Sequence, residues 1–204
     1  NYQGRHAPGK QDLSAALKVA HHLILTHASG TKAIKRNLPN AQVGIVLNTS
    51  WPLPASDSED DKRAARIHDG YFHRWFLDPI FKGHYPADMV EVYGDYLAYI
   101  DLDSVKVASN IPLDYLGVNY YKPEILEWNP DNPPFFDRAL RGDGVYTEMD
   151  WLVYPQGLRD VLIYFNEEYP VSSVYVTENG VAFNDGVPKD GVLEDPDRLE
   201  FLKS

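Results

Sequence analysis

Glu178 stands in a setting that is typical of a catalytic carboxylate. It lies in Val174-Tyr-Val-Thr-Glu-Asn-Gly180, where β-favouring residues lead into one acidic residue and then into a turn signal. The apolar run predicts a buried strand, with Glu178 at its carboxyl end. Barrels and open α/β sheets place catalytic groups at such ends. Taken alone, the segment fits an ordinary polar residue at a strand-to-loop junction equally well.

Two other predicted strands also end in polar or aromatic residues. Asn48 follows the apolar run 42–47, and Asn119 and Tyr121 close the run 113–121. Because the carboxyl ends of parallel strands share one face, these groups are expected to converge with Glu178. Aromatic faces together with amide and carboxylate groups suit the C–H faces and hydroxyls of a sugar. The residues therefore predict a polar, aromatic-rich site on an α/β scaffold, without naming a reaction.

Helical and strand patterns alternate along the chain. Apolar residues at helical spacing predict helices at about 12–29, 57–78 and 156–169, with a short one inside 86–99. Gly30 is a possible end for the first helix, although the pattern also allows a continuation through Ile34. Loops are expected at 50–58, which holds two prolines, and over the long stretch 123–144. Three short strands separated by helices indicate parallel pairing with right-handed crossovers.

Composition excludes several classes of function. The chain has 204 residues, a net charge of −11 and no cysteine, which argues against nucleic-acid binding, disulfides and thiolate chemistry. Its apolar runs are too short to span a membrane. No signal peptide is evident at the start, so a cytoplasmic location is the default expectation. His21 and His22 are adjacent rather than four residues apart, so no metal site is expected there.

Several segments of the chain resemble the family 1 glycoside hydrolases, the β-glucosidase family with a (β/α)8 TIM barrel. They are Tyr175–Gly180, Asp114–Tyr121, Trp75–Pro79 with Gly83–Pro86, Ala20–Leu25 and Trp151–Leu158. The segments occur in the family's order and cover essentially the whole chain. The resemblance implies a retaining β-glycosidase that acts on a small β-glucoside or oligosaccharide without a cofactor.

The resemblance also implies roles for particular residues. Glu178 matches the nucleophile that forms a covalent glycosyl-enzyme, and Tyr121 matches the tyrosine that donates a hydrogen bond to it. Asn119 matches an amide near the sugar. Trp151 matches an aromatic wall on the leaving-group side, and Asn48 is a candidate for the same outer site. For Tyr121, Asn119 and Trp151, ordinary packing or turn chemistry is the competing explanation.

The chain departs from the family pattern in two ways. Asp150 replaces a usual glycine and Leu152 a usual acidic residue, which changes the loop that carries Trp151. The family's acid/base glutamate lies in an Asn-Glu-Pro segment before the chain's first helix, and no such segment occurs here. We therefore expect residues 1–204 to form a single incomplete barrel domain, with about strands five to seven of eight and the acid/base outside the chain. Missing barrel segments would be its partners, and alone it should fold poorly and lack activity.

Two other functions fit the same residues. One is a 6-phospho-β-glycosidase of the same family, whose phosphate-binding residues would lie mainly near the eighth strand. The other is a non-catalytic carbohydrate-binding remnant, which would keep the aromatic and amide groups without the chemistry.

Overall fold

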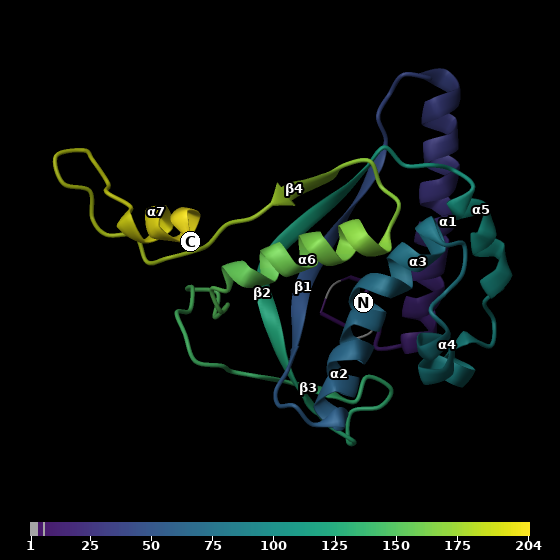
Figure 1. The fold of residues 1–204 in the computed structure, drawn as a ribbon, viewed down its shortest axis with the longest axis horizontal. Coiled ribbons are helices and arrows are strands. Elements are labelled where there is room, and N and C mark those ends of the chain that lie inside the picture. The colour runs from purple at the N-terminus through teal and green to yellow at the C-terminus, as the bar shows by residue number, and fades with distance from the viewer. Residues whose placement is uncertain (1–3, 6) are drawn as a thin grey trace.

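The computed structural model describes residues 4, 5 and 7–204, and these contain one four-stranded sheet. Strand β1 (Gly44–Pro54) pairs in parallel with β2 (Tyr115–Trp128). Strand β4 (Val174–Glu178) pairs in parallel with the first half of β2, and β3 (Asp137–Leu140) pairs antiparallel with its last residues. The parallel order β1–β2–β4, with a helix after each strand, confirms the predicted α/β class (Figure 1).

Helices make up much of the remaining chain, and the first two of them begin at side-chain caps. Asp12 accepts the Ala15 N–H at 2.9 Å, and Ser58 accepts the Asp61 N–H at 3.1 Å, which satisfies free N–H groups of the first turns. The α-helices are α1 Leu13–Asn37, α2 Glu59–Asp69, α3 Trp75–Phe81, α4 Ala87–Tyr93, α5 Lys106–Ser109, α6 Pro155–Glu168 and α7 Pro196–Lys203. A π-helical turn, Gly70–Arg74, joins α2 to α3, and 3₁₀ turns cover Gly94–Leu97 and Leu102–Val105. None of the described helices is long and apolar enough to cross a membrane.

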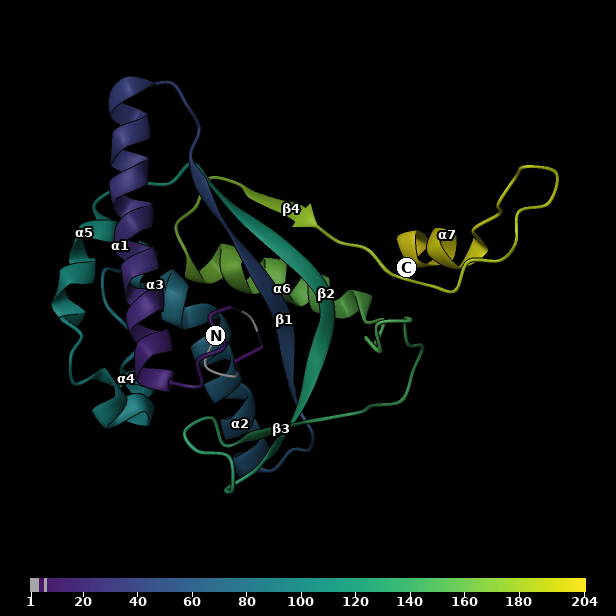
Figure 2. The same ribbon diagram turned by 180° about the vertical axis from the view of Figure 1, so that it is seen from behind.

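The core lies between the sheet and the helices on one of its faces. Alternate residues of β2, Leu116, Val118 and Tyr120, are at most 2% exposed and contact Val161 and Phe165 of α6. A second cluster joins α1 to the helices that follow α2. The other face of β1 and β2 has no covering helix in the described part of the chain (Figure 2). Gly117 on that face leaves room for its neighbours, because a Cβ there would come within 2.7 Å of Val46 and 3.0 Å of Thr177.

Two predicted boundaries in the first third of the chain were wrong. Helix α1 passes Gly30 and ends at Asn37 rather than near Ser29. Gly30 is exposed, and a glycine in a long helix costs only about 1 kcal/mol relative to alanine. Strand β1 continues through Pro52 and Pro54, which were expected in a loop. It pairs only with β2 among the described strands, and an edge strand tolerates prolines whose nitrogen faces away from the ladder.

The loop expected at 123–144 is partly a hairpin. Strand β2 runs on to Trp128, and β3 returns beside it with Ile125 opposite Leu140. Only four residues of β3 pair with β2, and such a short pairing has no clear local signal in the sequence. The sequence pattern therefore could not predict this hairpin. The predicted helix at 57–78 is also interrupted by the π-helical turn and then continues past Pro79.

Strand β4 exists as predicted but is not buried. Tyr175 and Val176 are 51% and 45% exposed. β4 pairs only with β2 among the described strands, so one of its edges is free. Beyond it the chain extends away from the sheet as an arm that ends in α7 (Figure 1). Arg198 holds this arm together by contacting Asp185 and Asp195.

Candidate active site

Three polar residues stand side by side across the parallel strands. In the strand register, Asn48 of β1 lies opposite Asn119 of β2, and Asn119 lies opposite Glu178 of β4. Three of the residues chosen from sequence are therefore brought together across three strands. Only Glu178 lies at the carboxyl end of its strand, where parallel α/β folds place active sites, because β1 and β2 continue past the ends predicted for them.

Bulges in the ladder bring the site residues onto one face. Val118 pairs with Val176, but the next residue, Asn119, pairs with Glu178, so β4 contains one extra residue. Without it, the alternation of a strand would turn Glu178 to the helix-covered face. On the other side of β2 the register shifts between Thr49 and Trp51. Bulges next to active sites commonly re-aim a side chain in this way.

Tyr121 and Glu178 are in direct contact. The Tyr121 hydroxyl donates a short hydrogen bond to Glu178 Oε2. This bond is the main cause that raises the pKa of the Tyr121 phenol above its ordinary value, with burial and the carboxylate charge adding to it. The phenol therefore keeps, at neutral pH, the proton that it donates to the carboxylate.

The Asn119 side chain is held at both ends of its amide. Its Nδ2 donates to Asn48 Oδ1 at 2.9 Å, and its Oδ1 accepts from the Thr177 hydroxyl at 2.7 Å. The main-chain oxygen of Asn119 accepts from the Thr49 hydroxyl at 2.9 Å. Sequence reasoning missed Thr177, although strand alternation from Tyr175 would have indicated its face. The amide of Asn119 is thus fixed in orientation by its neighbours.

Trp151 forms a wall beside Tyr121. The two ring centroids are 5.2 Å apart and the planes are inclined by 47°. Thr147 fixes the turn that carries Trp151, since its Oγ accepts the Trp151 N–H at 3.2 Å and its own N–H donates to the Trp151 carbonyl at 2.9 Å. Trp151 is only half-buried, so part of its ring remains available to a ligand.

The two departures from the family pattern have structural roles in this wall. Asp150 has a φ of +57°, a conformation that glycine adopts more easily, and it forms an ion pair with Arg141. Leu152 lies against the main chain of the same loop, where a Cβ on Gly144 would come within 2.7 Å of it. The loop therefore keeps its shape through contacts particular to this chain. In the described part of the chain, no cluster of His, Asp and Glu residues could hold a metal ion.

The comparisons with known proteins identify the family of the chain. The family model for Glycosyl hydrolase family 1 matches residues 1–204, and the chain belongs to that family. The solved β-glucosidase of Thermotoga maritima in complex with deoxynojirimycin superposes with a TM-score of 0.93 at 33% identity, over 100% of this chain and 46% of that one. The fold is thus part of a (β/α)8 TIM barrel.

Two curated relatives are named for different substrates. Beta-glucosidase A of Acetivibrio thermocellus is 35% identical over 100% of this chain and 46% of its own length. The 6-phospho-beta-glucosidase GmuD of Bacillus subtilis is 30% identical over 97% of this chain and 46% of its own length. The chain therefore spans less than half the length of the relatives that it matches.

Proposed function

We propose that residues 1–204 supply the nucleophile side of a retaining β-glycosidase of the β-glucosidase type. The observation that carries the proposal is the hydrogen bond from Tyr121 of β2 to Glu178 at the carboxyl end of the neighbouring parallel strand β4. Glu178 is the nucleophile and Tyr121 orients it. Asn119 and Asn48 lie on the same face and are the proposed hydrogen-bonding partners of the substrate. Trp151 is the proposed aromatic wall for the leaving group.

The proposed chemistry has two steps. The Glu178 carboxylate attacks the anomeric carbon, an ester forms, and the bond to the leaving oxygen breaks as a second carboxylic acid protonates that oxygen. The same second group then removes a proton from water, which attacks the anomeric carbon and releases Glu178. A retaining geometry requires the two carboxyl groups to lie about 5–5.5 Å apart.

We propose that the second carboxyl group and the rest of the barrel come from segments that residues 1–204 do not supply, here called the complementing segments. Two features support this. Strands β1 and β4 each have one edge without a partner among the described strands. An apolar groove also runs beside β1, lined by Leu23, Ile45, Val46, Phe72 and Phe76. The chain with these segments is called the assembled barrel, and the 204 residues form one incomplete domain of it. Alone, the chain should have little activity.

The site also bears on the two alternative functions. The similarity to GmuD means that a 6-phosphorylated substrate is still an alternative. A retaining enzyme would attack either substrate with the same arrangement of carboxyl groups. A binding remnant has no need to keep a tyrosine on the nucleophile. The intact Tyr121–Glu178 contact therefore favours an active enzyme.

The test is covalent trapping with a 2-deoxy-2-fluoro-glucoside that carries a good leaving group, read by intact mass and peptide mapping. The unaltered chain is compared with Glu178→Gln, alone and in the assembled barrel built with complementing segments of the Acetivibrio thermocellus relative. We expect one adduct, on Glu178, in the assembled barrel only. An adduct elsewhere, or none in the assembled barrel, would refute the nucleophile assignment.

A further inference from the structure

One histidine near the end of α2 and one in the π-helical turn that follows it reach the same residue of β1. The main-chain N–H of Ser50 donates to His73 Nε2 at 3.3 Å, and the Ser50 hydroxyl lies 3.2 Å from His68 Nε2. Residues five apart point about 140° away from each other on a regular α-helix. The π-helical turn Gly70–Arg74 widens the helix by one residue and brings both rings to one side.

Ser50 needs these partners because it lies in an irregular part of the ladder. Thr49 pairs with Tyr120, but Trp51 pairs with Pro123, so Ser50 has no counterpart in the register. It is 4% exposed, and a buried N–H without a partner would be costly. His73 therefore provides the acceptor that the neighbouring strand does not.

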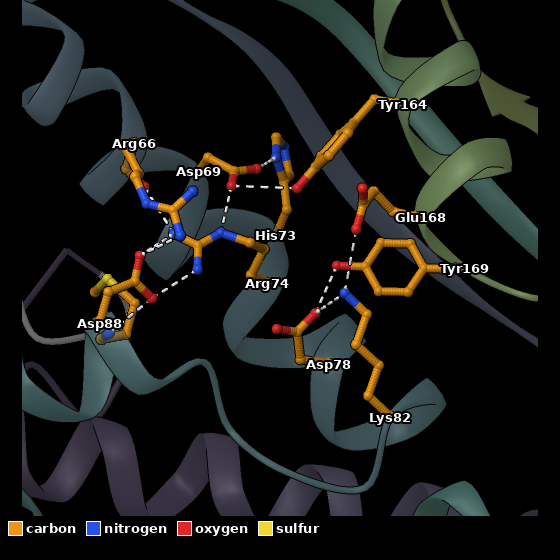
Figure 3. Close-up of polar contacts among 11 residues, drawn as sticks. Arg66, Asp69, His73, Arg74, Asp78, Lys82, Asp88, Tyr164, Glu168 and Tyr169 are labelled. Atoms are coloured by element: carbon orange, nitrogen blue, oxygen red, sulfur yellow. Dashed lines mark hydrogen bonds and ion pairs between the residues drawn. The ribbon is translucent and has the colours of Figure 1, made fainter.

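The surroundings of His73 fix its protonation and its position. Its ring is fully buried, and burial lowers its pKa despite the neighbouring Asp69. Since Nε2 accepts from Ser50, Nδ1 carries the proton and donates to Asp69 Oδ1 at 3.0 Å. Asp69 is in turn held by Arg74 Nε at 2.5 Å and by the Tyr164 hydroxyl at 3.3 Å (Figure 3).

Arg74 connects this pair to the next helix. Its guanidinium donates to both carboxylate oxygens of Asp88 in α4, at 2.7 and 3.0 Å. Bidentate pairs of this kind are among the more rigid polar contacts in proteins. The residues that fix His73 therefore come from α2, α4 and α6. The ring has little freedom to move away from Ser50.

On this basis, and resting on the proposed function, we propose that His73 is a positioning residue for the active site. It holds the middle of β1 at Ser50, next to Thr49, whose hydroxyl donates to the Asn119 carbonyl. Between the pairs Thr49–Tyr120 and Trp51–Pro123, Ser50 of β1 faces two residues of β2, Tyr121 and Lys122. A shift of Ser50 would therefore displace both Asn119 and the Tyr121 phenol that contacts Glu178.

Ser50, His68 and Asp137 are connected in the order of a hydrolytic Ser-His-Asp triad, but the serine is not accessible to a substrate. His68 Nδ1 lies 3.3 Å from Asp137 Oδ2 and 2.7 Å from the Tyr71 hydroxyl. Ser50 and His68 are 4% and 6% exposed, so no substrate can reach the serine hydroxyl. A nucleophile needs access to its substrate, and this arrangement fixes Ser50 instead.

Two similar amide substitutions separate the two hydrogen bonds of His73. In His73→Gln the longer side chain can still accept from the Ser50 N–H, whereas in His73→Asn the shorter one reaches only Asp69. Tyr169→Phe is the control. It removes a buried hydrogen bond of 2.8 Å from the residue that follows α6 to Asp78 of α3, and it does not touch Ser50 (Figure 3). All are made in the assembled barrel.

Three measurements are taken on each variant: the rate of trapping by the fluoro-glucoside, the pH profile of kcat/KM, and amide exchange at Ser50. We expect His73→Asn to lower the trapping rate about 10- to 100-fold, the effect of a small misplacement of reacting groups. The acidic limb of its kcat/KM profile should move to higher pH, and exchange at Ser50 should quicken. His73→Gln should stay within about threefold of the parent on the same scale. Tyr169→Phe should lower only the melting temperature.

Equal rates and profiles in the two His73 variants would overturn the proposal, as would an effect of Tyr169→Phe of the same size on the pH profile. If the unaltered assembled barrel is not trapped, the proposed function fails instead. Exchange at Ser50 then still tests the contact itself, because it needs no substrate.

Discussion

Glu178 lies directly opposite Asn119 across the β2–β4 pair, although Val176, two residues earlier, lies opposite the immediate neighbour Val118. One extra residue in β4 therefore places the carboxylate on the face that also carries Thr177. The Thr177 hydroxyl uses its place there to fix the Asn119 amide. Four expectations follow from the geometry of this region and of the core beneath it.

Removing the Glu178 carboxylate should abolish turnover. In the assembled barrel, Glu178→Ala is expected to lower kcat on the order of 10⁴- to 10⁶-fold, the range found when a nucleophile or its close partner is lost. Added azide should restore product formation from an activated aryl glucoside and give the α-glucosyl azide, because it attacks from the vacated side. The measurement is kcat with product analysis by NMR. Glu167→Gln, an exposed change in α6, is the control; a β-azide or full residual activity would contradict the role of Glu178.

Tyr121→Phe removes a hydroxyl that donates to Glu178 and little else. We expect kcat/KM to fall about 10- to 100-fold, as for loss of a preorganised hydrogen bond to a charged reacting group. The acidic limb of the pH profile should move to higher pH, because the ionised carboxylate loses a donor. Tyr120→Phe, in which the lost bond is to the Tyr154 carbonyl at 2.9 Å, is the matched control. A fall in stability without a shift of the limb would show that Tyr121 has only a structural role.

Gly157 and Gly30 should respond oppositely to alanine, although both lie in helices. A Cβ on Gly157 in α6 would overlap the Tyr120 hydroxyl, so Gly157→Ala should destabilise by about 1–3 kcal/mol, the cost of overpacking. A Cβ on Gly30 in α1 meets nothing within 4 Å, so Gly30→Ala should stabilise by about 0.5–1 kcal/mol through helix propensity. Denaturant unfolding of the assembled barrel measures both. Two changes of the same sign would contradict the packing described for Tyr120.

Acidification should destabilise the protein through His73. Burial lowers the pKa of His73 in the folded state. Between the folded-state and the unfolded-state pKa, the unfolded chain therefore binds a proton that the folded chain does not bind. The stability is fully present above the ordinary histidine value of about 6.5 and is lost as the pH falls below it, by roughly 1.4 kcal/mol per pH unit for one proton. His73→Gln should flatten unfolding free energies measured between pH 5 and 6.5, about where histidines titrate. Burial also lowers the pKa values of His21 and His27. In His73→Gln the unfolding free energy should therefore still depend on pH, with a smaller slope. An unchanged slope in His73→Gln would show that His73 does not contribute.

The sequence predicted which polar residues meet across the strands, because each apolar run is marked locally. The runs before Asn48, before Asn119 with Tyr121, and before Glu178 could be read without knowledge of their partners, and the register aligns these residues. Of the three predicted strand ends, only that of β4 at Glu178 was correct, because β1 and β2 continue to Pro54 and Trp128. The family resemblance also gave the correct class.

What the sequence could not show depends on contacts between distant segments. The extra residue in β4, the hairpin of β2 with β3 and the contact of His73 with Ser50 each require the partner to be in place. A proline is likewise read from sequence as a break. The free edge of β1 made that reading wrong at Pro52 and Pro54.

The π-helical turn gives the chain one place between α2 and α3 where its length can change without turning α3. A wide turn of five residues and a regular turn of about four both rotate the chain by roughly one full turn. If the five residues of Gly70–Arg74 became regular α-helix, α3 would rotate by about 100° relative to α2. Trp75, Leu77 and Ile80, each at most 3% exposed, would then point away from the core. Removing one residue together with the wide turn would leave α3 in phase, so a one-codon deletion should disturb the packing of α3 less here than inside α2.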